Sequence, residues 1–562
     1  MKAMNSLLYG YDNTKLISYE DMPKDFPVTV AYDDLPDLAI NGVLKANRYV
    51  DGKLMQTYSL QENHILTIAA TRLGKTTSCV IPLIASFARQ KVKRSFIVSD
   101  PKGELYKTLA ATLKNEGYKV LLFNLRDYAH SELWNPLSDI YKKFRRGVEI
   151  EDEVELVATE QGPRNRFRGV VYEDQTLLDT AIEQMRNLIY ADVDADLDKT
   201  AYAIIPPDQA KDQYWNEAPR QLFKALAWAM LEDSVAPGKR EPITEDTFSF
   251  NTLFNIMSSL TERQAYDDDD YFSGRGQDSR AYNYARSIIE NAAGTRQCIV
   301  SCFNAKMEGY RNSTIRLLTA CSSFTMESLT TGEPTVVFIS YPDESKVYYQ
   351  IISTFIQNAY TYLIGYANGR PNGKLDIPFY FILDEFGNFP PIADFDVVIS
   401  ACGGRNIWFD LVLQSYAQLN NVYGDKTAEI IRDNLNLHIF LGSNNPDTLK
   451  AFSQECGSMT RISPMSALNG SKEEIDHYTI ENIPLIPISR LAALKPGECI
   501  VTEANSGYVL FSKMERYFVC KEFSTLPQAS DQDYEVRINP LDKKYNYTPR
   551  KRSSGSGSFD YL

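Results

Sequence analysis

Three consecutive residues, Gly74, Lys75 and Thr76, are of the types and in the order that bind a nucleoside triphosphate. A lysine ammonium can reach the β- and γ-phosphates, and a threonine hydroxyl can coordinate Mg²⁺. An apolar segment at 64–69 precedes them, and a segment rich in small and apolar residues follows at 76–88. This order of strand, small-residue loop and helix is typical of a P-loop, whose backbone N–H groups and helix end hold phosphates. The predicted phosphate-binding residues are Thr71, Arg72, Leu73, Gly74, Lys75, Thr76 and Thr77.

One position departs from the strict P-loop pattern. Ala69 stands where the first glycine is expected. Glycine differs from alanine mainly in its access to positive φ. We therefore expect alanine to be tolerated here if this residue keeps a negative φ.

An acidic pair, Asp384 and Glu385, follows an uninterrupted apolar run at 377–383. Such a run is typical of a strand buried on both faces of a parallel sheet, and ligands bind at the carboxyl ends of such strands. By itself, an acidic pair at a strand end is often only solvated. Together with a P-loop, it predicts an ATPase in which Asp384 holds Mg²⁺ and Glu385 polarises the attacking water as a general base.

The composition limits the classes of protein to consider. The chain has 562 residues, of which 44% are hydrophobic and 23% charged, which is ordinary for a globular protein of two or three domains. Its net charge of −14 argues against a surface uniformly built for nucleic acid, so any DNA contact must be local or a property of an assembly. The 8 cysteines lack CxxC pairs, and we interpret them as buried thiols rather than zinc ligands.

The elements that must position these residues alternate between strand and helix. Strand-like segments at 95–98 and 118–123 flank a helical segment at 104–115, and strand signals resume at 334–340, 377–383, 407–413 and 437–441. A terminal β-hairpin is expected at 498–518, with a turn at 505–507. The sheet of an α/β fold thus begins before a long intervening block and is completed after it.

We predict four parts along the chain. They are an N-terminal segment at 1–60, a discontinuous nucleotide-binding domain at 61–139 and 326–525, an all-helical insertion at 140–325, and a tail at 526–562 expected to be disordered. An acidic run within the insertion, 267–270, is interpreted as a solvated loop.

Several segments together resemble the type IV secretion coupling proteins, the TraG/TraD-like ATPases of conjugation. Two of the segments are specific: Ser99-Asp-Pro-Lys-Gly-Glu-Leu105, and Asp384-Glu-Phe combined with Gln414-Ser. The others, in the family's order between about 64 and 460, are 70–76, 134–137, 214–215, 404–405, 418–419 and 441–443.

This resemblance implies a fold and roles for further residues. It implies a RecA-like P-loop domain with an inserted all-helical domain, assembled as a homo-hexameric ring that handles DNA. By carry-over, Arg405 is the candidate arginine finger, acting on the γ-phosphate bound to a neighbouring subunit. Gln414, beside the nucleotide strands, would sense γ-phosphate and relay its loss to DNA-facing loops. Asp100 and Lys102 should lie near the nucleotide pocket or the subunit boundary. The plainer alternatives are a surface arginine for Arg405 and a strand-capping glutamine for Gln414.

The predicted function is an ATP-driven coupling protein that recruits a relaxase–DNA substrate to a type IV secretion channel and pumps single-stranded DNA without regard to sequence. The all-helical domain would recognise relaxase or relaxosome proteins. A first alternative is a recruitment adaptor in which ATP only stabilises the ring. A second is a P-loop enzyme, such as a kinase, that acts on small phosphorylated substrates.

The expected location is the cytoplasm, at the cytoplasmic face of the membrane. Typical family members begin with transmembrane helices, whereas the longest apolar candidate here, 348–367, is interrupted by polar residues and reads as a packed helix. We therefore expect either a form tethered through a partner protein or a chain numbered after a removed anchor.

Overall fold

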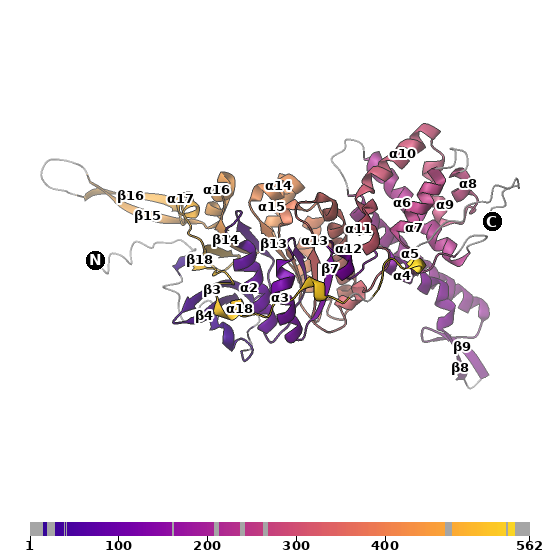
Figure 1. The fold of residues 1–562 in the computed structure, drawn as a ribbon, viewed down its shortest axis with the longest axis horizontal. Coiled ribbons are helices and arrows are strands. Elements are labelled where there is room, and N and C mark those ends of the chain that lie inside the picture. Colours follow the sequence, from indigo (N-terminus) through magenta and orange to yellow (C-terminus); the bar gives the residue numbers. More distant parts are fainter. Residues whose placement is uncertain are drawn as a thin grey trace. The chain divides into compact units, whose positions relative to one another are not determined.

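The computed structural model describes residues 15–18, 28–38, 40, 42–159, 162–206, 213–236, 242–261, 268–466, 475–535 and 538–545 (Figure 1). The chain forms two compact units. The sheet unit comprises Met1–Leu122, Thr331–Tyr341 and Leu363–Asp533. The helical unit comprises Phe123–Thr330, Pro342–Tyr362 and Tyr534–Leu562.

A ten-stranded sheet forms the core of the sheet unit. Its strand order is β1 (Lys15–Ser18), β18 (Tyr508–Lys513), β17 (Glu498–Glu503), β14 (Leu437–Gly442), β5 (Ile65–Ala69), β13 (Ile407–Leu413), β12 (Phe379–Leu383), β6 (Ser95–Asp100), β11 (Thr335–Ser340) and β7 (Lys119–Asn124). From β14 to β11 every neighbouring pair is parallel, whereas β17 pairs antiparallel with both β14 and β18. The carboxyl ends of β5, β13, β12 and β6 therefore meet at one edge.

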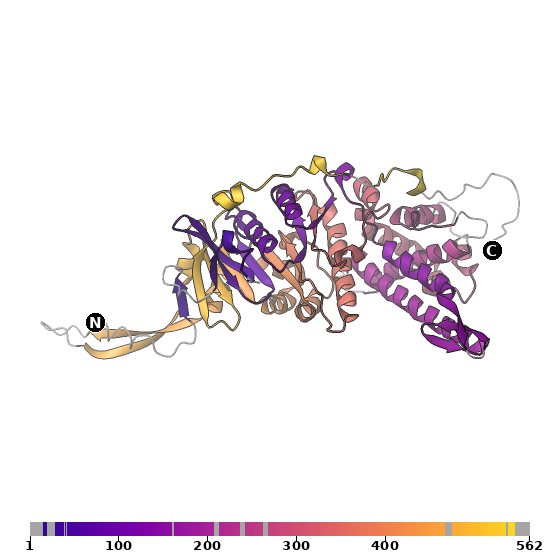
Figure 2. The same cartoon turned by 90° about the horizontal axis from the view of Figure 1, so that it is seen from below.

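Apolar side chains explain why this sheet is central. All residues of β5 and β12 are buried, as the uninterrupted apolar runs predicted. Helices α2 (Ile81–Arg89) and α3 (Glu104–Asn115) lie on one side of the strands. Helices α13 (Phe395–Cys402), α14 (Tyr416–Tyr423), α15 (Asp425–Asp433) and α16 (Pro446–Glu455) lie on the other side (Figures 1 and 2).

Two smaller sheets complete this unit. Near the N-terminus, β2 (Thr29–Ala31), β4 (Lys53–Ser59) and β3 (Val43–Val50) form an antiparallel sheet. Strands β15 (Ser458–Ser466) and β16 (Ile475–Pro484) form a two-stranded ribbon that extends away from the body of the unit (Figure 2). The predicted C-terminal hairpin is present as β17 and β18.

The helical unit is built from α4 (Ser138–Val148), α5 (Gln175–Ile204), α6 (Tyr214–Val235), α7 (Phe250–Thr261), α8 (Asp268–Ser273), α9 (Arg280–Ile289), α10 (Ala293–Lys306), α11 (Ser313–Leu318) and most of α12 (Tyr349–Asn368). The expectation of an all-helical block needs correction. Strands β8 (Val154–Thr159), β9 (Gly162–Phe167) and β10 (Val170–Tyr172) form an antiparallel sheet within it. Strand β8 is rich in β-branched residues, and Gly169 at positive φ turns the chain between β9 and β10.

Three further expectations can be compared with the structure. Residues 268–270 of the acidic run begin α8 rather than a loop, and Asp267 lies outside the described residues. The tail is not disordered throughout, because the Ala529 backbone N–H donates to the Lys107 carbonyl at 2.8 Å; residues 546–562 lie outside the described residues. Six cysteines are buried, but Cys298 is exposed and Cys302 half-buried.

The structure also bears on membrane spans and metal clusters. Within the described ranges, no helix combines the length and the apolar character needed to cross a membrane. In the same part of the chain, no group of three or more His, Cys, Asp or Glu side chains is arranged to hold a metal ion.

Candidate functional site

The loop after β5 has the backbone of a phosphate-binding loop. Arg72 and Gly74 have φ of 71° and 95°, and the loop leads into η2 (Lys75–Val80), a π-helical turn continuous with α2. A Cβ atom at Gly74 would lie 2.9 Å from the Ser78 hydroxyl, so this position requires glycine for both space and φ. Ala69 ends β5 and is not among the residues of positive φ, which satisfies the condition for an alanine there.

The acidic pair lies beside this loop, as predicted. The Thr76 hydroxyl donates to Asp384 Oδ2 at 2.5 Å. The Lys75 ammonium forms an ion pair with Glu385 and lies 3.7 Å from Asp384 Oδ1. The structure therefore brings together the lysine, the hydroxyl and both carboxylates that a triphosphate and its cation need.

Asp384 and Glu385 differ in environment. Burial raises the pKa of Asp384, while Lys75 and the Thr76 hydroxyl oppose that rise. A carboxylate and a threonine hydroxyl are hard oxygen ligands, so this donor pair fits Mg²⁺. Glu385 is more exposed and has φ of 59°, a left-handed conformation that is uncommon for a residue other than glycine.

Gln414 contacts both the P-loop and Glu385. It follows β13, and its Nε2 donates to Glu385 Oε2 at 3.2 Å, while its Oε1 accepts from the Thr71 hydroxyl at 3.2 Å. Its backbone N–H donates to Gln418 Oε1 at 2.8 Å. Gly387 leaves room for Gln418, since a Cβ atom there would lie 2.7 Å from that side chain. Gln414 thus touches both the P-loop and the predicted general base.

The end of β14 supports the P-loop from the other side. The Ala70 N–H donates to the Gly442 carbonyl at 2.9 Å, and the Ser443 hydroxyl donates to the Gln414 carbonyl at 3.3 Å. Gly442 has φ of 139°, and a Cβ atom there would lie 2.8 Å from Leu73 Cδ1. Sequence reasoning noted segment 441–443 only as part of the resemblance and missed this supporting role.

The structure places Arg405 away from the phosphate-binding residues of its own chain. Arg405 ends η9 (Gly403–Arg405), two residues before the first residue of β13, whereas Gln414 directly follows that strand. A strand of seven residues is roughly 20 Å long, so the two residues lie at opposite edges of the sheet. The Arg405 guanidinium donates to Asn368 Oδ1 and to the Ala401 carbonyl, both at 2.9 Å.

Among the described residues, the side chains of Asp100 and Lys102 form no hydrogen bond or ion pair with the P-loop or the acidic pair. Asp100 Oδ2 accepts the Tyr106 N–H at 2.9 Å, so this carboxyl group secures the first turn of α3. Burial raises the pKa of Asp100 to about 6, against the lowering effect of its backbone hydrogen bonds. Lys102 is exposed. Their role toward a nucleotide stays a prediction.

Asp410 is a buried carboxyl group that sequence reasoning missed. It lies in the middle of β13 and is 2% exposed. Burial, with the nearby charge of Asp384, raises the pKa of Asp410 to about 8. An acidic residue within an otherwise apolar strand, Ile407–Leu413, was the available signal.

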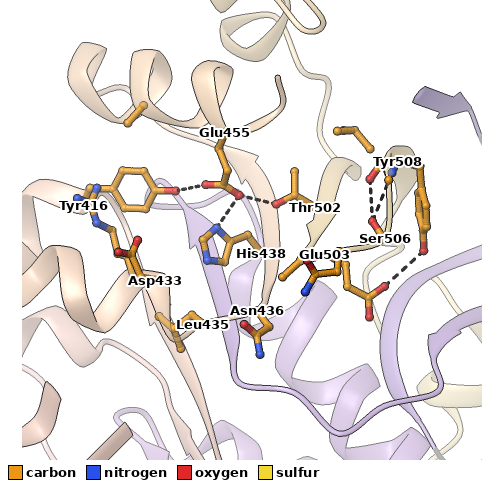
Figure 3. Close-up of a pocket in the computed structure, with 16 residues that line it drawn as sticks. Tyr416, Asp433, Leu435, Asn436, His438, Glu455, Thr502, Glu503, Ser506 and Tyr508 are labelled. Atoms are coloured by element: carbon orange, nitrogen blue, oxygen red, sulfur yellow. Dashed lines mark hydrogen bonds and ion pairs between the residues drawn. The ribbon is translucent and has the colours of Figure 1, made fainter. Parts of the chain in front are cut away.

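A second polar cluster lines a cavity of about 630 Å³ on the α14–α16 side of the sheet unit (Figure 3). Glu455 lies at its centre and accepts hydrogen bonds from Tyr416 at 3.1 Å and Thr502 at 2.5 Å. It also pairs with His438 Nδ1 at 2.7 Å. Burial alone would raise the pKa of Glu455, but these three partners lower it. Because Tyr416 is two residues after Gln414, the cluster anchors the segment that leaves the nucleotide site.

His64 allows a prediction about pH. It precedes β5, and its Nδ1 accepts the Phe409 N–H at 3.0 Å, which requires the neutral ring. Burial lowers the pKa of His64 to about 4, below its value in the unfolded chain. Folded protein then binds fewer protons than unfolded protein, so we expect His64 to cost stability as pH falls from about 6.5 toward 4. His64→Gln, which keeps an acceptor, should flatten this loss in thermal unfolding midpoints measured between pH 7.5 and 5.

The control for that experiment is His130→Gln, which changes a half-exposed histidine of the helical unit. This variant should keep the wild-type loss of midpoint. An unchanged pH profile in His64→Gln would contradict the assignment.

Comparisons with known proteins identify similar chains among proteins of conjugative DNA transfer. A model of the family described as type IV secretory system conjugative DNA transfer matches residues 29–482. Protein VirD4 of Agrobacterium fabrum is 21% identical over 406 residues, which make up 71% of this chain and 50% of VirD4. Conjugal transfer protein TraG of Escherichia coli is 35% identical over 111 residues, or 19% of this chain and 16% of TraG. The chain thus spans half or less of the length of these relatives.

Solved structures extend the likeness to the fold. The unbound bacterial conjugative coupling protein TrwBdeltaN70 superposes with a TM-score of 0.57 at 14% identity, covering 86% of this chain and 92% of that one. Plasmid coupling protein TrwB in complex with ADP and Mg²⁺ has a TM-score of 0.56 at 13% identity, covering 90% and 94%. At these identities the likeness concerns the fold, and it confirms the predicted P-loop α/β class with a helical domain.

Proposed function

Because the chain belongs to the type IV secretory system conjugative DNA transfer family, we propose that it is a P-loop ATPase that drives DNA toward a type IV secretion channel. One observation carries the proposal. Lys75, Thr76, Asp384, Glu385 and Gln414 come from three separate segments and meet within hydrogen-bond or ion-pair reach at one edge of the sheet. That arrangement suits hydrolysis of the γ-phosphate of ATP.

Each residue has a distinct role in this proposal. Backbone N–H groups of the loop and the Lys75 ammonium hold the phosphates, and Lys75 exchanges its contact with Glu385 for the γ-phosphate when ATP binds. Glu385 then becomes available to accept a proton from the attacking water. Thr76 and Asp384 would hold Mg²⁺, which offsets phosphate charge when bound.

Gln414 couples the chemistry to motion. It contacts both Thr71 of the P-loop and Glu385, so loss of the γ-phosphate changes its hydrogen bonds. We infer that this change reaches DNA through the segment after β13. DNA contacts would be sequence-independent phosphate contacts, so binding should weaken steeply with salt.

Membership of the family also suggests an assembly and partners for this chain. The active form is a homo-hexamer at the cytoplasmic face of the membrane, joined there to channel components through a partner protein or an anchor. The helical unit recruits relaxase or relaxosome proteins.

Steady-state ATP hydrolysis at low salt, with and without single- and double-stranded DNA, tests the proposal. We expect single-stranded DNA to stimulate turnover, and Lys75→Ala to reduce it by about 100-fold or more because the phosphate charge loses its main cation. Lys107→Ala, which changes an exposed lysine of the same unit, is the matched control and should retain turnover. Nucleotide binding without hydrolysis under any condition would contradict the motor and favour the adaptor.

A further inference from the structure

The segment after β18 lies against the P-loop, although nothing in its sequence marks it as part of the site. The Tyr517 N–H donates to the Thr77 carbonyl at 2.9 Å, in the first turn after the loop. Upstream, the Met514 N–H donates to the Gly497 carbonyl at 2.7 Å, and the Glu515 N–H donates to Asn47 Oδ1 at 2.5 Å. These bonds fix the backbone of 514–517 beside the turn that receives phosphates.

Arg516 places a cation at the glycine of the loop. Its Nε lies 3.4 Å from the point that a Cβ atom would occupy at Gly74. The side chain is half-buried, and among the described residues no carboxylate lies within ion-pair distance of its guanidinium. A guanidinium that has no acidic partner and lies beside a phosphate-binding loop is free to bind an anion such as a phosphate.

An aromatic ring continues from this arginine toward solvent. The Phe518 ring centre lies 5.9 Å from the Arg516 guanidinium carbon, within the range of a cation–π contact. Phe518 is 52% exposed and Val519 is 55% exposed. An exposed phenylalanine next to a phosphate loop presents an apolar face of the kind on which a nucleobase stacks.

We propose that Arg516 and Phe518 form the nucleoside side of the binding site. The N–H groups of a P-loop hold the α- and β-phosphates, and Arg516 lies beside Gly74 of this loop. Its guanidinium therefore binds the α-phosphate, and the Phe518 ring stacks on the purine base. Stacking discriminates little between purines, so this site accepts adenine and guanine nucleotides alike. The inference rests on the proposed nucleotide-binding function and adds the residues that recognise the nucleoside part.

Binding of ADP, GDP and inorganic tripolyphosphate to the full chain, measured by calorimetry, tests this inference. Phe518→Ala should weaken ADP and GDP about tenfold, because stacking contributes roughly 1–3 kcal/mol per base, and leave tripolyphosphate unchanged. Arg516→Ala should weaken all three ligands about tenfold. Phe518→Trp, which keeps an aromatic ring at this position, should bind ADP and GDP with the affinity of the wild type.

Two controls and the failing outcomes complete the design. Val519→Ala changes the adjacent exposed side chain, and Arg490→Ala removes a different arginine that stacks on Phe511; both should bind like the wild type. If Lys75→Ala abolishes ADP binding while Arg516→Ala and Phe518→Ala stay within twofold of wild type, the inference is wrong and the proposed function stands. If the wild-type chain binds neither nucleotide nor tripolyphosphate, both are wrong.

Discussion

Replacing Glu385 by glutamine is expected to lower ATP turnover by about 100-fold or more while nucleotide affinity is retained or increased. The amide has the same shape but cannot accept the proton of the attacking water. It also removes the ion pair between Glu385 and Lys75, so the lysine meets less competition for phosphate. Gln414 Nε2 can still donate to the amide oxygen at this position. Single-turnover hydrolysis and calorimetric ADP binding measure the two effects separately.

Asp394→Asn is the matched control for that variant. Asp394 is another acidic residue in a left-handed conformation, with φ of 52°, but it lies at the start of α13 outside the site. Its amide variant should hydrolyse ATP like the wild type. If Glu385→Gln hydrolyses ATP near the wild-type rate, Glu385 is not the general base and another residue must serve in that role.

The parts of the fold that could be predicted are those specified by local pattern. The helix expected at 104–115 is α3, and the hairpin expected at 498–518 is formed by β17 and β18. Apolar runs locate buried strands because both faces of such strands are covered. The order of strands in the sheet could not be predicted, since β5 lies between β13 and β14, which come over 330 residues later in the chain.

The same distinction separates the candidate site residues that the sequence indicated from those that it did not. Lys75, Thr76, Asp384 and Glu385 belong to short motifs whose chemistry depends on residue type, and the structure brings them together. Gly442 and Arg516 act through position alone. One leaves space for Leu73, and the other reaches Gly74 from a segment more than 400 residues away, so no local spacing marks either of them.

Removing the Arg405 guanidinium is expected to lower turnover by about 1,000-fold, with little change in ADP binding to the single chain. An arginine finger contributes roughly 10³–10⁵ in rate by stabilising charge in the transition state. Arg405 precedes β13 whereas the phosphate-binding residues lie past its far end, so it cannot serve its own site. Hydrolysis by Arg405→Ala and Arg405→Lys, with Arg370→Ala as an exposed-arginine control, measures the effect.

Mixing inactive variants distinguishes an arginine finger from a structural arginine. Arg405 also donates to the Ala401 carbonyl and to Asn368, so Arg405→Ala loses some stability whatever its role. If Arg405 acts across subunits, mixed assemblies of Arg405→Ala and Lys75→Ala chains contain interfaces with an intact P-loop on one side and an intact arginine on the other. Those interfaces should recover part of the wild-type turnover, which neither variant shows alone. A structural role predicts no recovery, because each site would then depend only on its own chain.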